Sequence, residues 1–253
     1  MDDMCGRFVS SHSPDKIAAY FGASFEGDAL PANFNVAPTH DVYGVVESAD
    51  GRKLTTFHWG LVPSWAKDIK IGNKMINARA ETITEKPAFK GLFKKHRLLI
   101  PMDGFYEWKV VEGQDGAKPT KHPQFIHRVD SEPLAVGGLW ALWRDRSKPA
   151  DPSSDQEMAA EQSASLDADP WLHSCTIMTT AANETMAPVH NRMPVLVPQS
   201  AWAQWLDPSN QDLESLTALL QPAPNDVLTM YPVSTAVNNV RNKGEELLQQ
   251  IDG

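Results

Sequence analysis

The sequence predicts an α+β protein: a single domain built on a curved, mostly antiparallel, barrel-like β-sheet with short peripheral helices. Three observations lead to this prediction. Short segments rich in apolar, β-branched and aromatic residues recur along the 253-residue chain, which is typical of strands. Segments with the periodicity of a helix are few and short. The chain also contains 19 prolines, which indicate a protein rich in loops and turns.

Strands are expected wherever an apolar run or an alternating pattern lies between turn-forming residues. The expected strands are residues 42–47, 54–61, 97–100, 105–111, 124–129, 134–143, 174–180, 194–197 and 228–232. The clearest helix covers residues 16–21, because Ser13 offers an N-cap and Pro14 suits the first helical position. Further helices are expected at residues 200–206, 213–220 and 245–251.

The charged residues are unevenly distributed. The net charge of −9 argues weakly against a nucleic-acid partner. Residues 145–170 alone carry seven acidic and two basic side chains, which is over half of that net charge. This stretch is rich in Ala, Ser, Asp and Pro, so we expect a flexible acidic insertion within one domain. Basic clusters at residues 90–97 and 118–128 leave room for a local cationic groove.

The cysteine content and the hydropathy pattern bear on the cellular compartment. Two cysteines, Cys5 and Cys175, form no disulfide framework and fit a reducing cytosol. No apolar run approaches the roughly 20 residues that span a bilayer, and the N-terminus lacks a signal-peptide pattern. A cytoplasmic protein without a membrane partner is therefore expected.

Cys5 is the candidate nucleophile. If residues 1–4 are removed, Cys5 carries a free α-amine beside its thiol. An α-amine has a pKa of about 7.7–8.0, so a usable fraction is neutral at physiological pH and can attack an aldehyde to give a Schiff base. The thiol can then close a five-membered thiazolidine ring. The alternative is a small, buried cysteine in a first strand.

Three further segments carry polar groups suited to such chemistry. Asn77 could hold an amine or a sugar oxygen, and Arg79 could bind a phosphate. Glu107 lies between two aromatic residues, where desolvation would raise the pKa of a carboxyl group and suit it to shuttle protons. His190 offers an imidazole that titrates near neutral pH, beside Arg192.

Each of these segments also has a purely structural interpretation. Residues 77–82 could begin a helix with charges on its surface. Glu107 could be the solvent-facing residue of an alternating strand, and His190 a loop histidine without a role. Trp59 and Trp65 would stack on bases if their rings were exposed, but they could equally be core residues.

Taken together, these segments resemble the SRAP family, the SOS response-associated peptidases that shield abasic sites. The matching segments are residues 4–8, 33–39, 59–63 with Trp65, 77–82, 97–108, 138–140, 176–181, 190–194, and 233–234 with 237–238. They follow one another along nearly the whole chain. One such motif would be weak evidence, whereas the ordered set is highly specific.

The resemblance implies a single α+β domain with a positively charged cleft for single-stranded DNA and no metal or organic cofactor. It implies that Cys5 becomes N-terminal and forms a thiazolidine with the aldehyde of a ring-opened abasic deoxyribose. By the same resemblance, Asn77 orients the nucleophile and the sugar, Glu107 shuttles protons, and His190 assists opening of the sugar ring. The expected DNA-binding residues are Arg7, Asn35, Pro38, Trp59, Trp65, Arg79 and Arg192.

The sequence departs from the family pattern in two places. The family usually begins Met-Cys, whereas three residues precede Met4 here. We therefore expect residues 1–4 to be a propeptide or to reflect a misassigned start, with the SRAP domain at residues 5–253. Autoproteolysis, as in some family members, would expose Cys5. The acidic insertion at residues 145–170 is also longer than the usual link.

Three functions follow as hypotheses. The first is covalent capture of an abasic site in single-stranded DNA by a monomer that joins the nucleoid when bound to damaged DNA, with lyase-like chemistry. The second is a cysteine-dependent peptidase, with Cys5 as nucleophile, His190 as base and Glu107 as its partner. The third is a non-covalent binder of single-stranded DNA.

Overall fold

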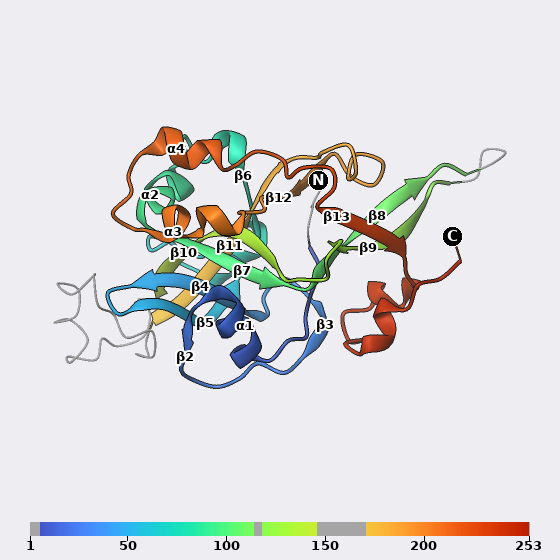
Figure 1. Ribbon diagram of the computed structural model, residues 1–253, viewed down its shortest axis with the longest axis horizontal. Helices are drawn as coiled ribbons and strands as arrows, with labels where there is room; N and C mark the ends of the chain where they lie inside the picture. The colour runs from blue at the N-terminus through green and yellow to red at the C-terminus, as the bar shows by residue number, and fades with distance from the viewer. Residues whose placement is uncertain (1–5, 114–117, 146–170, 253) are drawn as a thin grey trace.

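A closed ring of five strands forms the centre of the fold (Figure 1). In this computed structural model, which describes residues 6–113, 118–145 and 171–252, the ring is mostly antiparallel. Its strands are β4 (Asp41–Ser48), β5 (Gly51–Trp59), β7 (Arg97–Met102), β10 (Leu134–Arg144) and β11 (Trp171–Ala181). A short parallel pairing of β11 with β5, with Cys175 opposite Trp59, closes the ring. The predicted barrel-like sheet is therefore confirmed.

A second sheet of five strands lies beside the ring, in the order β13-β9-β8-β1-β3. Its strands are β1 (Phe8–Ser10), β3 (Asn33–Val36), β8 (Gly104–Val111), β9 (Thr120–Arg128) and β13 (Leu228–Pro232). The hairpin of β8 and β9 extends away from the rest of the protein (Figure 1). The first sheet is extended by β2 (Ser24–Phe25), β6 (Asn77–Arg79) and β12 (Arg192–Pro194).

The helices are short and peripheral, as predicted. They are α1 (Pro14–Phe21), α2 (Pro87–Lys95), α3 (Trp202–Leu206) and α4 (Leu213–Ala218), with 3-10 turns at Ile69–Lys74, Ala80–Thr82, Gln199–Ala201, Thr235–Asn238 and Glu245–Leu248. The Ser13 hydroxyl accepts the N–H of Lys16 at 3.4 Å, which confirms the predicted N-cap of α1. The helix expected at residues 245–251 is a 3-10 turn that ends at Leu248.

The structure corrects several predicted boundaries. Residues 77–82 do not begin an α-helix but form β6 followed by a 3-10 turn. The strand expected at residues 54–61 starts at Gly51 and ends at Trp59, because Gly60 has a φ of +138° that side chains rarely adopt. The strand expected at residues 194–197 is β12, which ends at Pro194. Four short strands, β1, β2, β3 and β6, and helix α2 were not predicted.

Arg97 is a buried cation at the start of β7, only 2% exposed. Its guanidinium donates to the carbonyl oxygens of Phe93 (2.7 Å) and Lys94 (2.6 Å), which are free at the C-terminal end of α2. It also donates to carbonyls at Trp205 (2.5 Å), Asp207 and Asn210 (3.2 Å). Burial lowers the pKa of Arg97 to about 10, so the side chain stays charged at neutral pH. Arg97 thus joins α2 to the segment between α3 and α4.

Further sequence-based predictions concern membrane-spanning segments and the stretches at residues 1–4 and 145–170. Among the described residues, no helix combines the length and the apolar character needed to cross a membrane. The acidic insertion expected at residues 145–170 and the expected propeptide at residues 1–4 lie, apart from Asp145, outside the described residues.

Candidate functional site

The candidate site begins where β1 runs alongside β8. The two strands are antiparallel, and the N–H of Tyr106 donates to the carbonyl of Arg7 at 2.9 Å. Continued by one residue on each strand, this register brings Gly6 level with Glu107. Cys5 itself lies outside the described residues. The described chain therefore begins level with Glu107. Its first residue, Gly6, directly follows the candidate nucleophile in the sequence.

Glu107 is a buried carboxylate, with 3% of its surface exposed. It lies in the inner half of β8, where strand alternation puts it on the same face as Phe105. Phe105 packs into the core cluster shared with the strand ring. The alternative in which Glu107 faces solvent is therefore wrong. Carboxyl side chains are seldom buried this deeply, and such groups are often functional.

Asn77 is held by the pairing of β6 with β11. The short strand β6 runs parallel to β11, with Asn77 opposite Ile177. The residue before it, Ile76, accepts a hydrogen bond at its carbonyl from the indole Nε1 of Trp59 at 3.0 Å. The backbone at Asn77 is thus fixed from two sides.

The same contact corrects the expectation for Trp59. Its ring is 0% exposed and packs on Phe8 with a centroid distance of 5.1 Å. The ring is therefore core and offers no stacking surface to a base. Trp65, in contrast, is 60% exposed and remains a candidate for stacking.

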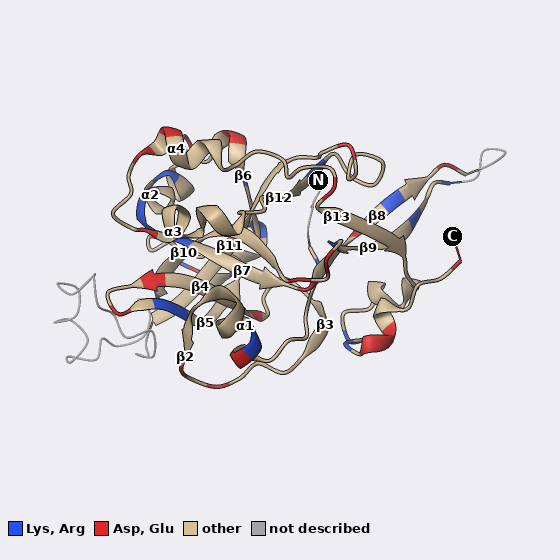
Figure 2. Cartoon of the chain, in the orientation of Figure 1, with Lys and Arg blue, Asp and Glu red and all other residues tan. Residues whose placement is uncertain are grey.

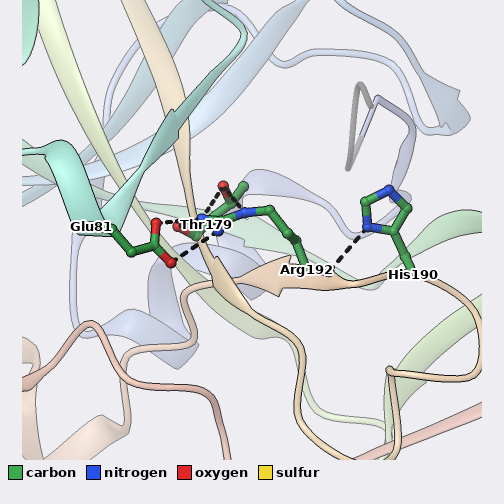
Figure 3. Close-up of polar contacts among 4 residues, drawn as sticks. All are labelled: Glu81, Thr179, His190 and Arg192. Atoms are coloured by element: carbon green, nitrogen blue, oxygen red, sulfur yellow. Dashed lines mark hydrogen bonds and ion pairs between the residues drawn. The ribbon is translucent and has the colours of Figure 1, made fainter. Parts of the chain in front are cut away.

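His190 occupies the loop before β12. Its own N–H donates to the carbonyl of Met186 at 3.0 Å, and its Nδ1 accepts the backbone N–H of Arg192 at 3.1 Å (Figure 3). Because a backbone amide can only donate, Nδ1 carries no proton, and the hydrogen of the neutral ring is on Nε2. His190 therefore presents an N–H donor at the Nε2 end of its ring.

Arg192 holds the loop in place through its side chain. The guanidinium donates two hydrogen bonds to Glu81, at 2.9 and 2.8 Å, and one to the carbonyl of Thr179 at 2.7 Å (Figure 3). The hydrogen bond from Arg192 lowers the pKa of the Glu81 carboxyl group. Arg192 is thus engaged with its own protein, and its expected contact with DNA stays a prediction.

The candidate side chains surround one core cluster. Phe8, Ile76, Phe105 and Met186 all belong to this cluster. Glu107 follows two residues after Phe105 on β8, Asn77 directly follows Ile76, and His190 is hydrogen-bonded to Met186. Segments far apart in the sequence thus place a carboxylate, an amide and an imidazole next to members of one core cluster.

Asn35 has a structural role that the sequence did not indicate. It is 0% exposed, and its Nδ2 donates to the carbonyls of Val237, Asn239 and Asn242 at 3.0–3.2 Å. Its Oδ1 accepts from Arg7 at 3.0 Å. The expected DNA contact of this side chain is therefore corrected, because Asn35 instead ties β3 to the C-terminal segment and anchors Arg7.

Positive charge gathers beside β3. Arg7 is half-buried, and burial lowers its pKa. The pKa of His40 is also lowered, first by burial and then by the charges of Lys243 and Arg7. Pro38 lies next to this group and is partly exposed, and Arg79 is exposed on β6. Sequence reasoning missed His40 and Lys243, which lie about 200 residues apart and show no local motif.

The described side chains also bear on metal binding. In the parts of the chain that the structure describes, no three His, Cys, Asp or Glu side chains are grouped so that they could hold a metal ion. The remaining cysteine, Cys175, is fully buried in β11, and burial raises the pKa of its thiol. It is therefore a core residue rather than a second nucleophile.

The strand ring and the second sheet define an α+β domain, and the candidate polar residues adjoin members of the core cluster that the two sheets share. The chain belongs to the SOS response associated peptidase (SRAP) family, whose model matches residues 4–240. It is 37% identical over 249 residues to the abasic site processing protein YoqW of Bacillus subtilis (strain 168), covering 97% of this chain and 99% of the relative. It is 29% identical over 255 residues to the abasic site processing protein YedK of Escherichia coli (strain K12), covering 98% and 100%.

A vertebrate relative and a solved structure extend these similarities. The chain is 32% identical over 229 residues to the abasic site processing protein HMCES of Gallus gallus, covering 82% of this chain and 61% of that protein. A crystal structure of a protein from Bacteroides thetaiotaomicron superposes with a TM-score of 0.77 at 24% identity, covering 98% of this chain and all of the other. The latter similarity concerns the fold alone.

Proposed function

We propose that this protein recognises abasic sites in single-stranded DNA and captures them covalently through an N-terminal Cys5. The support comes from the family, from relatives named as abasic site processing proteins, and from the site geometry. One observation carries the proposal. Gly6, which follows Cys5 in the sequence, lies level with Glu107 across the pairing of β1 with β8. The proposal takes Cys5, the residue before Gly6 in the sequence, to react beside this carboxylate.

The reaction requires that the α-amine of Cys5 be free. Either translation begins at Met4 and the methionine is removed, or water hydrolyses the bond between Met4 and Cys5 in an autoproteolytic step. The neutral amine adds to the C1′ aldehyde of the ring-opened deoxyribose, and the resulting carbinolamine loses one water to give an imine. The Cys5 sulfur then attacks the imine carbon, and the thiol proton passes to the nitrogen. The product is a thiazolidine that joins protein and DNA with the net loss of one water.

Glu107 and Asn77 are the groups suited to assist this sequence. In the proposal, Glu107 transfers the protons that leave the amine and enter the departing hydroxyl. Asn77, held by the β6–β11 pairing, orients the amine and the sugar through its amide. Both side chains are positioned by strands rather than by loose loops, which favours a fixed geometry for capture.

His190 supports the capture of a sugar better than the cleavage of peptides. Opening of the deoxyribose ring converts the ring oxygen to a hydroxyl group, and a donor near that oxygen assists the step. The Nε2–H of His190 is such a donor, because its Nδ1 accepts the Arg192 amide. A peptidase base must instead accept the proton of the Cys5 thiol, and neither ring nitrogen is available for that in this arrangement.

The DNA backbone has candidate ligands on both sides of the site. Arg79 is exposed on β6, while Arg7, His40 and Lys243 gather beside β3. The cations among them, Arg7, Arg79 and Lys243, favour phosphate groups flanking the lesion, whereas the lowered pKa of His40 favours its neutral form. The exposed ring of Trp65 offers a surface on which a base can stack, and this would favour unpaired strands.

Replacement of Cys5 by serine distinguishes the three hypotheses. The Cys5→Ser protein keeps the amine but loses the thiol, so borohydride should trap an imine with an abasic oligonucleotide. Without borohydride, no adduct should survive denaturation, whereas the wild-type adduct should survive. If the wild type cleaves peptides and the variant does not, the peptidase hypothesis is favoured. If neither protein forms any adduct, with or without borohydride, the covalent proposal is wrong.

A further inference from the structure

The outer part of the β8–β9 hairpin carries solvent-exposed side chains on both faces. We call residues 109–111 of β8 and 120–122 of β9 the arm. All six are exposed, including Val110 at 51% and Val111 at 41%. Basic segments, drawn in blue, lie on both of its strands (Figure 2). The arm extends away from the body of the protein, so a ligand can approach either face (Figure 1).

One face of the arm continues directly from the candidate site. Residues directly opposite each other in an antiparallel pair share a face, and the face alternates with each residue along a strand. The cross-strand pairs on the face of Glu107 are Glu107 with Gln124, Lys109 with His122, and Val111 with Thr120. We call this the site face. The opposite face carries the pairs Trp108 with Pro123 and Val110 with Lys121.

The site face of the arm presents a cation and hydrogen-bonding groups. Lys109 forms no ion pair within the described residues, and its ammonium is exposed. Across the hairpin from it, the ring Nε2 of His122 is hydrogen-bonded to the hydroxyl of Thr120 at 2.9 Å. Two residues along a strand span about 6.8 Å. Lys109 and His122 therefore form the first polar row beyond Glu107, about one nucleotide away from the site.

The charge of the row formed by Lys109 and His122 favours a phosphate group as its ligand. The protein as a whole carries a net charge of −9, so an exposed lysine beside the site is not part of a general basic surface. An ammonium and an imidazole next to each other complement a phosphodiester, to which lysine binds as a point charge. A single DNA strand anchored at Glu107 would carry such a phosphate outward along the arm.

We propose that the site face of the arm guides one of the two DNA flanks, with Lys109 and His122 binding the first or second phosphate beyond the abasic site. This inference rests on the proposed function, because it takes the lesion to lie at Glu107. The inference adds a direction for the DNA strand to the proposed function. The strand on one side of the lesion follows the arm, and the strand on the other side does not.

The test compares two lysines on opposite faces of the same arm. Lys109→Gln removes the charge on the site face, and Lys121→Gln removes the same charge from the opposite face. Lys109→Arg keeps the charge and should retain binding. Equilibrium binding is measured over a range of salt concentrations with oligonucleotides that carry a stable abasic analogue. One oligonucleotide extends only 5′ of the analogue and the other only 3′.

Lys109→Gln should flatten the slope of log Kobs against log salt by about 0.7, the value for one lost phosphate contact on a single strand. This change should occur for only one of the two extensions, and Lys121→Gln should match the wild type for both. Equal effects of the two variants, or no effect of Lys109→Gln on either extension, would overturn the inference. Adduct formation by the wild type with a natural abasic site is measured in parallel. If the wild type forms adducts while Lys109→Gln leaves the salt dependence of binding unchanged, the arm inference fails and the proposed function stands.

Discussion

The backbone amide of Arg192 donates to Nδ1 of His190 at 3.1 Å, and this contact sets which nitrogen of the imidazole carries its proton. The same residue holds Glu81 with two hydrogen bonds through its guanidinium. The position of His190 therefore depends on an ion pair on the other side of Arg192. Under the proposed function, Glu81 and Arg192 are positioning residues, since they would act on the sugar only through His190.

The ion pair predicts a pH-dependent contribution to stability. The hydrogen bond from Arg192 keeps the pKa of folded Glu81 below its ordinary value of 4.5. The stabilisation is therefore complete above pH 4.5 and is lost as the pH falls through the lower, folded pKa. Because half of the Glu81 side chain is exposed, the pair should contribute at most about 1 kcal/mol.

The measurement is the difference in melting temperature between the wild type and Glu81→Gln from pH 7 to pH 3. The wild type should be the more stable protein at neutral pH, and the difference should shrink as the pH falls below 4.5. Glu85→Gln is the control, because Glu85 forms no ion pair within the described residues. A difference that stays constant over the whole range would contradict the assignment.

Glu107→Gln should slow both formation and reversal of the DNA adduct. A glutamine keeps the shape of the side chain but cannot take up and release a proton, and proton transfer by a positioned group typically contributes 10²–10⁴-fold in rate. Single-turnover kinetics in both directions would measure this. Glu112→Gln, on the exposed segment that follows the same strand, is the matched control. Unchanged rates in both directions would remove Glu107 from the mechanism.

Substitutions at Trp65 and Trp59 should separate DNA binding from stability. Trp65→Ala should weaken binding of undamaged single-stranded DNA by about 1–3 kcal/mol, the cost of one lost base stack, without lowering the melting temperature. Trp59→Ala should lower the stability by about 3–5 kcal/mol, because its ring is fully buried. Fluorescence anisotropy and thermal melts make the comparison. Normal DNA binding by Trp65→Ala would rule out stacking on this ring.

Arg97→Met should destabilise the protein by about 3–5 kcal/mol. The substitution leaves the five carbonyl oxygens that Arg97 binds without their donor in a buried place. Urea denaturation measures the loss. Lys94→Met, an exposed neighbour in α2, should change stability by less than about 0.5 kcal/mol. Equal stabilities of the two variants would show that the Arg97 network contributes little.

Much of the fold could be predicted from local patterns. The long strands β4, β8, β10 and β11 bury enough apolar residues for their pattern to be visible within one segment. Ser13 and Pro14 marked the start of α1 correctly. Helix α2 also begins with a proline, Pro87, but the residue at its N-cap, Lys86, makes no side-chain cap hydrogen bond, so the usual signal was missing.

The parts that were missed depend on contacts between distant segments. The three-residue strands β1 and β6 exist because β8 and β11 lie beside them, and their own sequences are too short to reveal a period. The role of Asn35 depends on carbonyls more than 200 residues away. Whether a tryptophan is core or exposed, as Trp59 and Trp65 show, is decided by tertiary packing rather than by its neighbours in sequence.

The measurement that tests the central claim most directly is the intact mass of the purified protein, alone and after incubation with a single-stranded oligonucleotide that carries one abasic site. The account predicts a protein that lacks residues 1–4 and that gains the mass of the oligonucleotide less one water, in a complex that survives denaturation. A protein that lacks residues 1–4, begins at Cys5 and gains no mass would contradict it.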